Sequence, residues 1–292
     1  MLDFILRIIL ASSVIGIASL GELIDQRSGI LNVGIEGLML FGATFGFIAA
    51  KVTGSFLTGF LAGTLMGGVL GLLHGFLSIT LKVDQIVSGM GIWILGFGLT
   101  TYIGQPYTGP LGMGRIPTIF GISPFVYVAV AFMIITWYVL FKTNLGLKIR
   151  STGEDPRVVE SSGISVTKTR YLCVTIGGLL GGFAGAIFGL HYNPVWSPNL
   201  IMGWGFIALA LVFFSLWHPL ILLAGSLLFG ALWQLSVNPS VLFPGVMSTN
   251  LWRMVPYILT IVVLSVISTE RFRTRFGLTK PDALAEPYIK EA

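Results

Sequence analysis

The sequence of 292 residues is 54% hydrophobic and only 10% charged, with a mean hydropathy of +0.90. Soluble domains carry about 25% charged residues, so this composition excludes a water-facing globular enzyme. The formal net charge is +5, but the basic residues follow a membrane topology and do not form a nucleic-acid-binding patch. One cysteine, Cys173, excludes an intrachain disulfide and a cysteine–histidine metal cluster.

A helix needs about 20 apolar residues to cross the hydrocarbon core of a bilayer. Nine segments meet this need, and most carry no charge in their middle: 4–20, 31–50, 56–80, 85–104, 123–141, 171–191, 200–217, 219–237 and 252–269. We therefore expect an all-α, polytopic transmembrane bundle of about nine spans (8–10), forming one transmembrane domain over residues 1–292. The first segment lacks the features of a cleaved signal peptide and is expected to remain as a span.

Two features of this series leave alternatives open. Residues 200–237 are also compatible with two short helices folded around Trp217-His218-Pro219. Residues 37–75 and 205–235 both run as an apolar helix that begins at a glycine, a short break and a glycine-rich helix. Such an echo suggests an inverted repeat, which is common in transporters, although shared membrane composition explains it equally well.

Lysine and arginine are unequally divided between the two sides that nine spans define. Of the 17 basic residues, 13 lie on the side that holds the loop 142–170 and the tail 270–292. The four on the other side are Arg7, Lys51, Arg115 and Arg253. Because cytoplasmic loops are enriched in lysine and arginine, the loop and the C-terminus are predicted to be cytoplasmic and the N-terminus external.

A polar stretch leads into the second predicted span and carries Asn32 and Glu36, four residues apart. If this stretch is helical, both side chains lie on one face. A carboxylate at membrane depth is costly and usually faces a partner or a water-filled cavity. The glycines Gly29, Gly34 and Gly37 free backbone groups that can line such a cavity. Glu36 therefore either borders a substrate pathway or braces neighbouring helices through hydrogen bonds to their backbone.

The loop 142–170 contains signals for both ends of a short helix. Asp155 is a favourable N-cap, Pro156 suits the first helical position, and Gly163 suits the residue beyond the helix end. A helix of about seven residues is too short to be stable alone in water. We therefore expect it to dock on a cytoplasmic partner, because an ordinary re-entry loop does not need such precise capping.

Aromatic residues within the predicted spans are candidates for the walls of a pathway. Trp93, Phe97, Trp204 and Phe206 can stack against a flat or sugar ring if they face a cavity. Helix packing or an interfacial belt is the commoner role for each of them alone.

No chemical motif supports catalysis by this chain. The three histidines fit no metalloprotease pattern and no nucleophile–base arrangement, and no phosphate-binding loop motif occurs. We therefore expect no catalytic residue, no metal ligand and no cofactor in this chain.

Both polar motifs resemble permease subunits of ABC importers of the ribose, simple-sugar and nucleoside type. Residues 20–40 (LGELIDQRSGILNVGIEGLML) are similar to the nucleoside branch, which works with basic-membrane-protein-type lipoproteins, and residues 153–164 (GEDPRVVESSGI) resemble the family's coupling loop. Residues 203–210, together with Pro219 and Phe229-Gly230, also resemble this family. The family usually has Asn at the position of Asp155 and Ala at those of Val158 and Val159.

The resemblance implies a translocation pathway for nucleosides or related ribose-like solutes in the cell membrane. It implies three kinds of partner: a cytoplasmic ABC ATPase that binds ATP and magnesium, a second permease subunit that is a longer paralogue, and an external substrate-binding lipoprotein. The candidate ATPase-coupling residues are Arg150, Gly153, Glu154, Asp155, Pro156, Arg157, Val158, Val159, Gly163 and Ile164. The candidate pathway residues are Asn32, Glu36, Trp93, Phe97, Trp204 and Phe206. The alternative is an ion-coupled secondary transporter that uses Glu36.

Overall fold

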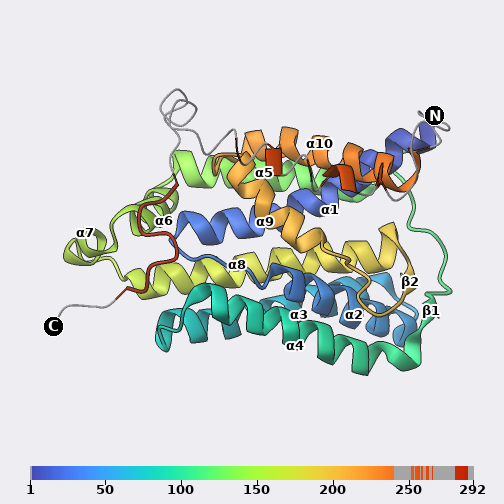
Figure 1. The fold of residues 1–292 in the computed structure, drawn as a ribbon, viewed down its shortest axis with the longest axis horizontal. Helices are drawn as coiled ribbons and strands as arrows, with labels where there is room; N and C mark the ends of the chain where they lie inside the picture. Colours follow the sequence, from blue (N-terminus) through green and yellow to red (C-terminus); the bar gives the residue numbers. More distant parts are fainter. Residues whose placement is uncertain are drawn as a thin grey trace.

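The computed structural model describes residues 2–239 and 280–288, with scattered positions between 251 and 265. The described helices are α1 (Leu2–Arg27), α2 (Ile35–Thr53), α3 (Phe56–Gly75), α4 (Gln85–Gly104), α5 (Pro124–Lys142), α6 (Asn144–Glu154), α7 (Pro156–Ser161), α8 (Val166–Ile187), α9 (Trp204–Phe214) and α10 (Pro219–Val237). They lie side by side along one axis, with α6, α7 and residues 280–288 at one end and the start of α1 at the other (Figure 1). The short strands β1 (Gly109–Pro110) and β2 (Val195–Trp196) pair antiparallel at the N-terminal end, with Gly109 opposite Trp196.

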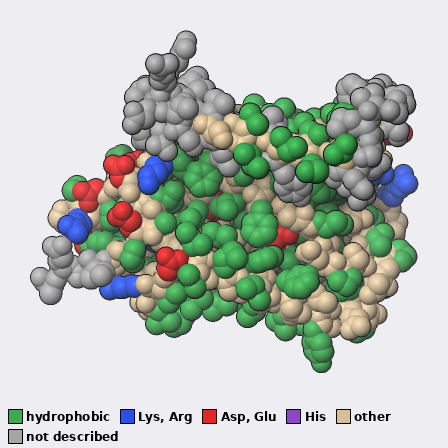
Figure 2. Space-filling model, in the orientation of Figure 1, with side chains coloured by type: hydrophobic (Ala, Val, Ile, Leu, Met, Phe, Trp, Pro, Cys, Tyr) green, Lys and Arg blue, Asp and Glu red, His purple; other side chains and the backbone are tan. Residues whose placement is uncertain are grey.

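Seven of the described helices are long and apolar enough to cross a membrane. They are α1, α2, α5 and α10, together with α3, α4 and α8 extended by their short terminal turns to Thr80, Tyr107 and Tyr192. Hydrophobic side chains cover the middle of the visible face and charged ones gather toward its ends (Figure 2). The predicted polytopic helical bundle is therefore confirmed.

The segment 200–217, predicted as a full span, is helical over only part of its length. α9 has 11 residues, which is about 16 Å of helix at 1.5 Å per residue, or roughly half of a bilayer core. Residues 197–203 complete the crossing as non-helical chain after β2. At the other end of the bundle, the Trp217 carbonyl accepts a hydrogen bond from Arg27 Nε at 3.0 Å. The prediction of an unbroken helical span at 200–217 is therefore wrong. The last predicted span, 252–269, lies largely outside the described residues.

The crossing that contains α2 also consists of non-helical chain followed by a helix, and it runs in the opposite direction to the crossing that contains α9. Residues 28–34 run back from the end of α1 as non-helical chain before α2 begins (Figure 1). α2 then ends beside the β1 segment, where Lys51 Nζ lies 3.4 Å from the Pro110 carbonyl. The helices α2 and α9 therefore point away from each other, and their N-termini meet inside the bundle. This arrangement agrees with the inverted echo between residues 37–75 and 205–235.

Glycine allows the central helices to approach closely. A Cβ atom on Gly42 in α2 would collide with the backbone of Gly182 in α8, and one on Gly67 in α3 would collide with Gly178 and Gly182. Without a hydrophobic driving force in lipid, helices associate through such backbone contact. The three helices α2, α3 and α8 therefore form a rigid layer against which α1 and α4 are placed.

Candidate functional site

The loop 142–170, which contains the candidate coupling residues and is called the coupling loop below, folds as two consecutive helices, α6 and α7. The Asp155 carboxylate Oδ1 accepts hydrogen bonds from the backbone N–H groups of Arg157 and Val158, at 2.9 and 3.3 Å. Gly163 has φ +79°, and the Ile164 N–H donates to the Val159 carbonyl at 3.2 Å. These contacts close the helix at both ends, so the predicted capping by Asp155, Pro156 and Gly163 is confirmed for Pro156–Ser161.

Sequence reasoning missed α6, which occupies Asn144–Glu154. Its signal is Thr143, whose hydroxyl accepts a hydrogen bond from the Gly146 N–H at 3.2 Å as an N-cap. Its last turn lies directly on the end of α1, because a Cβ on Gly153 would collide with the Arg27 carbonyl. Gly153 is therefore a point of close approach that joins the loop to the bundle.

The side chains of α7 divide into an exposed face, called the open face below, and a face buried against the rest of the chain. Val158 is 59% exposed, whereas Val159 is 4% exposed and packed under the loop. Adjacent residues on a helix point about 100° apart, so a helix of this length that rests on its own protein buries one of the two. Of the candidate coupling residues, Val159 is therefore buried against its own chain, while Val158, Glu154, Asp155 and Arg157 remain on the open side.

Arg150 does not lie freely on that open side. Its guanidinium carbon lies 5.0 Å above the ring of Phe141 in α5, and its Nε atom is buried. A guanidinium over an aromatic ring is held by a cation–π contact. The candidate coupling residue Arg150 therefore packs α6 onto α5.

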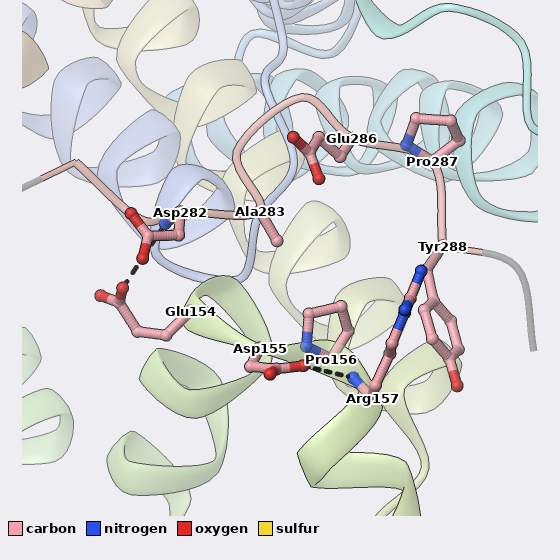
Figure 3. A pocket seen from close by; sticks show the side chains of 9 residues that line it. All are labelled: Glu154, Asp155, Pro156, Arg157, Asp282, Ala283, Glu286, Pro287 and Tyr288. Atoms are coloured by element: carbon pink, nitrogen blue, oxygen red, sulfur yellow. Dashed lines mark hydrogen bonds between the residues drawn. The ribbon is translucent and has the colours of Figure 1, made fainter.

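The segment 280–288 lies against the coupling loop, which nothing in the sequence indicated. The Ala283 N–H donates to the Gly153 carbonyl at 2.9 Å, and the Asp282 N–H lies 3.4 Å from Glu154 Oε2. Between the segment and the start of α7 is a pocket of about 700 Å³. Figure 3 shows its lining, in which residues 282–288 face residues 154–157 across the opening.

Glu36 joins the two broken helices inside the bundle. Its side chain is 1% exposed, and its two carboxylate oxygens accept hydrogen bonds from the N–H groups of Gly203 and Gly205, both at 2.7 Å. The N-terminus of a helix carries partial positive charge, so α9 compensates the buried carboxylate. Of the two readings of Glu36, the structure favours bracing of neighbouring helices.

Asn32 lies before α2 begins, so it does not share a helix face with Glu36, and that conditional prediction is wrong. Its side-chain oxygen accepts a hydrogen bond from the Gly34 N–H at 3.0 Å, and its own N–H donates to Glu22 Oε1 at 3.1 Å. The buried Glu22 carboxylate also accepts a hydrogen bond from Gln26 Nε2 at 2.8 Å. These contacts hold the non-helical segment 28–34 against the last turns of α1.

The same end of α1 holds the turn between α9 and α10. The Trp217 indole N–H donates to Gln26 Oε1 at 2.6 Å, in addition to the bond from Arg27 to the Trp217 carbonyl. Gln26 and Trp217 are 191 residues apart, so sequence reasoning could not pair them. Contacts therefore connect the coupling loop to α1, α1 to the end of α9, and the start of α9 to Glu36.

The candidate aromatic residues fall into two groups. Trp204 is fully buried and packs against Phe188, with ring centroids 4.7 Å apart, so it belongs to the core and does not line a pathway. Trp93 and Phe206 are half-buried and meet edge to face with centroids 5.4 Å apart. Phe97 is 43% exposed on the same helix as Trp93. These three residues therefore lie on the open side of the α2–α9 junction.

A helical bundle of this length and hydropathy, with two crossings broken in opposite directions, defines a multi-pass membrane protein of the transporter class. The family model for the permease component of branched-chain amino acid transport systems matches residues 4–264. The chain belongs to this permease family and is a permease subunit of an ABC importer.

Three relatives align with most of the chain. The putative glucose ABC transporter permease protein TsgC13 of Haloferax volcanii is 37% identical, covering 96% of this chain and 95% of its own length. The guanosine ABC transporter permease protein NupQ of Bacillus subtilis is 35% identical, covering 94% and 92%. The nucleoside ABC transporter permease protein NupC of Lactococcus lactis is 31% identical, covering 85% and 86%. No solved structure matches this chain.

Proposed function

We propose that this permease carries nucleosides into the cell. The observation that supports this substrate is the similarity, over most of the chain, to two relatives whose names specify guanosine and nucleosides. The resemblance of residues 20–40 to the nucleoside branch supports the same substrate. Glucose is the second candidate, because the relative from Haloferax volcanii is named as a putative glucose permease.

The proposed partner set follows from the family and from the loop. A cytoplasmic ABC ATPase binds the open face of α7 and hydrolyses ATP with magnesium, since no phosphate-binding loop motif occurs in this sequence. A second permease subunit, a longer paralogue, completes the pathway, and an external lipoprotein delivers the substrate. In this arrangement the N-terminus is external, and the loop 142–170 and the C-terminus are cytoplasmic.

The proposed pathway runs past the open side of the α2–α9 junction. The side chains of Trp93, Phe97 and Phe206 offer aromatic surface there for a nucleobase to stack on. Glu36 fixes the junction from behind through its bonds to Gly203 and Gly205. An ion-coupled transporter that uses Glu36 is set aside, because both carboxylate oxygens are already engaged by backbone donors.

The experiment combines transport with assembly. The chain, its second permease, its ATPase and its binding protein are reconstituted in vesicles, and ATP-dependent uptake of labelled guanosine is measured with unlabelled guanosine, ribose or glucose as competitor. We expect competition by guanosine. Competition by glucose alone would overturn the nucleoside assignment and favour the second candidate.

The docking face is tested with one charge introduced at Val158. Val158→Asp places a carboxylate on the most exposed apolar side chain of α7, so it should weaken co-purification of the ATPase and abolish guanosine uptake. Phe120→Asp is the matched control, because Phe120 is 96% exposed and lies on the opposite side of the predicted membrane. Normal ATPase binding by Val158→Asp would contradict α7 as the docking element.

A further inference from the structure

The segment 280–288 is bound to two other parts of the chain at once. Its Ala283 N–H bonds to Gly153 at the end of α6, and its Ala285 N–H donates to the Gly29 carbonyl in the α1–α2 break, at 3.2 Å. Ala283 is 5% exposed, and Leu284 packs against the main hydrophobic core. Residues near a chain terminus are usually poorly ordered unless contacts hold them. Hydrogen bonds and apolar packing therefore hold this segment against the rest of the chain.

Arg170 in α8 bonds both to the α1–α2 break and to segment 280–288. It is 2% exposed, and its Nε donates to the Ser28 carbonyl and its Nη1 to the Glu286 carbonyl, both at 3.2 Å. A buried guanidinium is unfavourable unless its N–H groups are bonded. Arg170 satisfies two of them on backbone carbonyls, one in the α1–α2 break and one in segment 280–288.

Gly29 is the point at which these groups converge. It has φ +90°, and a Cβ built on it would lie 2.8 Å from Arg170 Nη2 and 3.1 Å from the Ala283 carbonyl oxygen. Only glycine adopts this backbone conformation easily, and only glycine leaves room for the guanidinium. The break in the second crossing is therefore packed directly against segment 280–288 and Arg170.

We propose that residues 280–288, held by Arg170, form a coupling strap that ties the coupling loop to the α1–α2 break. This inference rests on the proposed function, in which an ATPase binds the open face of α7. The strap makes the end of α6 and the non-helical segment 28–34 move together, so movement of the loop reaches the broken crossing that Glu36 joins to α9. Apart from the strap, α6 approaches this region where Gly153 lies against the end of α1.

The main test is a pair of truncations of the full complex. A chain ending at Thr279 lacks the strap, whereas a chain ending at Tyr288 keeps it and serves as the control. We expect the shorter chain to bind the ATPase normally but to transport less guanosine per ATP hydrolysed, by on the order of tenfold, as expected for a lost connection between coupled sites. Wild-type coupling in both truncations would overturn the strap.

A point substitution covers the case in which the shorter chain does not fold. Ala283→Glu places a charge at a buried position and should unseat the strap, while Asp282→Asn changes an exposed neighbour and should leave coupling intact. Arg170→Lys keeps the charge but loses the forked geometry, and it should show the same loss of coupling as Ala283→Glu in smaller degree. If Ala283→Glu is folded, assembled and fully coupled, the proposal is wrong.

Cross-linking distinguishes a strap from a lid. Cys173 is fully buried, so cysteines at Glu154 and Asp282, which are both exposed, can be joined selectively by a bifunctional thiol reagent. A strap stays closed through the transport cycle, so cross-linked Glu154→Cys/Asp282→Cys chains should retain the coupling that the same chains show before the reagent is added. Loss of transport on cross-linking would overturn the strap and indicate a lid that must open. A wild-type complex that neither transports guanosine nor hydrolyses ATP would instead refute the proposed function.

Discussion

Glu36 is a buried carboxylate whose charge is balanced by backbone alone. The N–H groups of Gly203 and Gly205 occupy its two oxygens, and both belong to the first turn of α9 or its cap. A charged side chain at membrane depth usually pairs with a cation or faces water. Here the partial positive charge of a helix N-terminus takes that role, so the residue stabilises a break that the bilayer would otherwise penalise.

We predict that Glu36→Gln lowers the stability of the protein. A glutamine side chain has only one acceptor oxygen. Its NH₂ group would face one of the two backbone N–H donors and could not accept its hydrogen bond. The loss should be about 1–3 kcal/mol, as for a buried hydrogen bond left unmade, and should appear as a lower Tm of the detergent-purified chain. Glu286→Gln, at an exposed position, is the control. An unchanged Tm combined with altered uptake would instead make Glu36 a pathway group.

At the scale of the helices, backbone contact between α2, α3 and α8 sets the positions of the broken crossings. The contact depends on glycines whose missing Cβ atoms leave room for a facing carbonyl, such as Gly42 against Gly182. Other glycines, such as Gly91 in α4, have no atom within 4 Å of a Cβ position. The abundance of glycine in this chain therefore has more than one cause.

These two kinds of glycine should respond oppositely to alanine. Gly42→Ala forces α2 away from α8, and overpacking of this kind costs about 1–3 kcal/mol. Gly91→Ala should be neutral or slightly stabilising, because alanine is the better helix former. Thermal unfolding of the two purified variants checks this difference. Equal stability of both would show that α2 and α8 are not in backbone contact.

At the scale of the whole molecule, the chain has a cytoplasmic end and an external end. The coupling loop, the α9–α10 turn and residues 280–288 meet at one end, and β1 and β2 lie at the other (Figure 1). The crossing between Ser161 and Ser197 is α8, so these two serines lie at opposite ends.

We predict that cysteines at Ser161 and Ser197 are labelled from opposite sides of the membrane. Ser161 is the exposed last residue of α7, and Ser197 is half-buried directly after β2. Cys173 is buried and should give no background labelling. Right-side-out and inverted vesicles treated with an impermeant maleimide provide the measurement. Labelling of both sites in the same vesicles would mean that the number of crossings between them is even.

The sequence alone determined the class of fold and the ends of α7, and it predicts the sidedness. Hydrophobicity over about 20 residues is a local property of the sequence, and it is sufficient to predict that a helix crosses the bilayer. Capping by Asp155 and Gly163 is equally local, because each acts on backbone groups within a few residues. The resemblance carried by residues 20–40 and 153–164 added the permease family.

Only the tertiary structure decided the roles of Glu36, Val159, Trp204 and segment 280–288. Each role depends on a contact between residues far apart in the chain, such as Glu36 with Gly203, 167 positions away. Hydropathy did not distinguish an unbroken span at 200–217 from the half-helix α9, because the non-helical part is stabilised by partners elsewhere and not by its own composition. The physical reason is the same in each case: a buried polar or apolar group is satisfied by whichever atom folding brings beside it, and spacing along the sequence does not specify that atom.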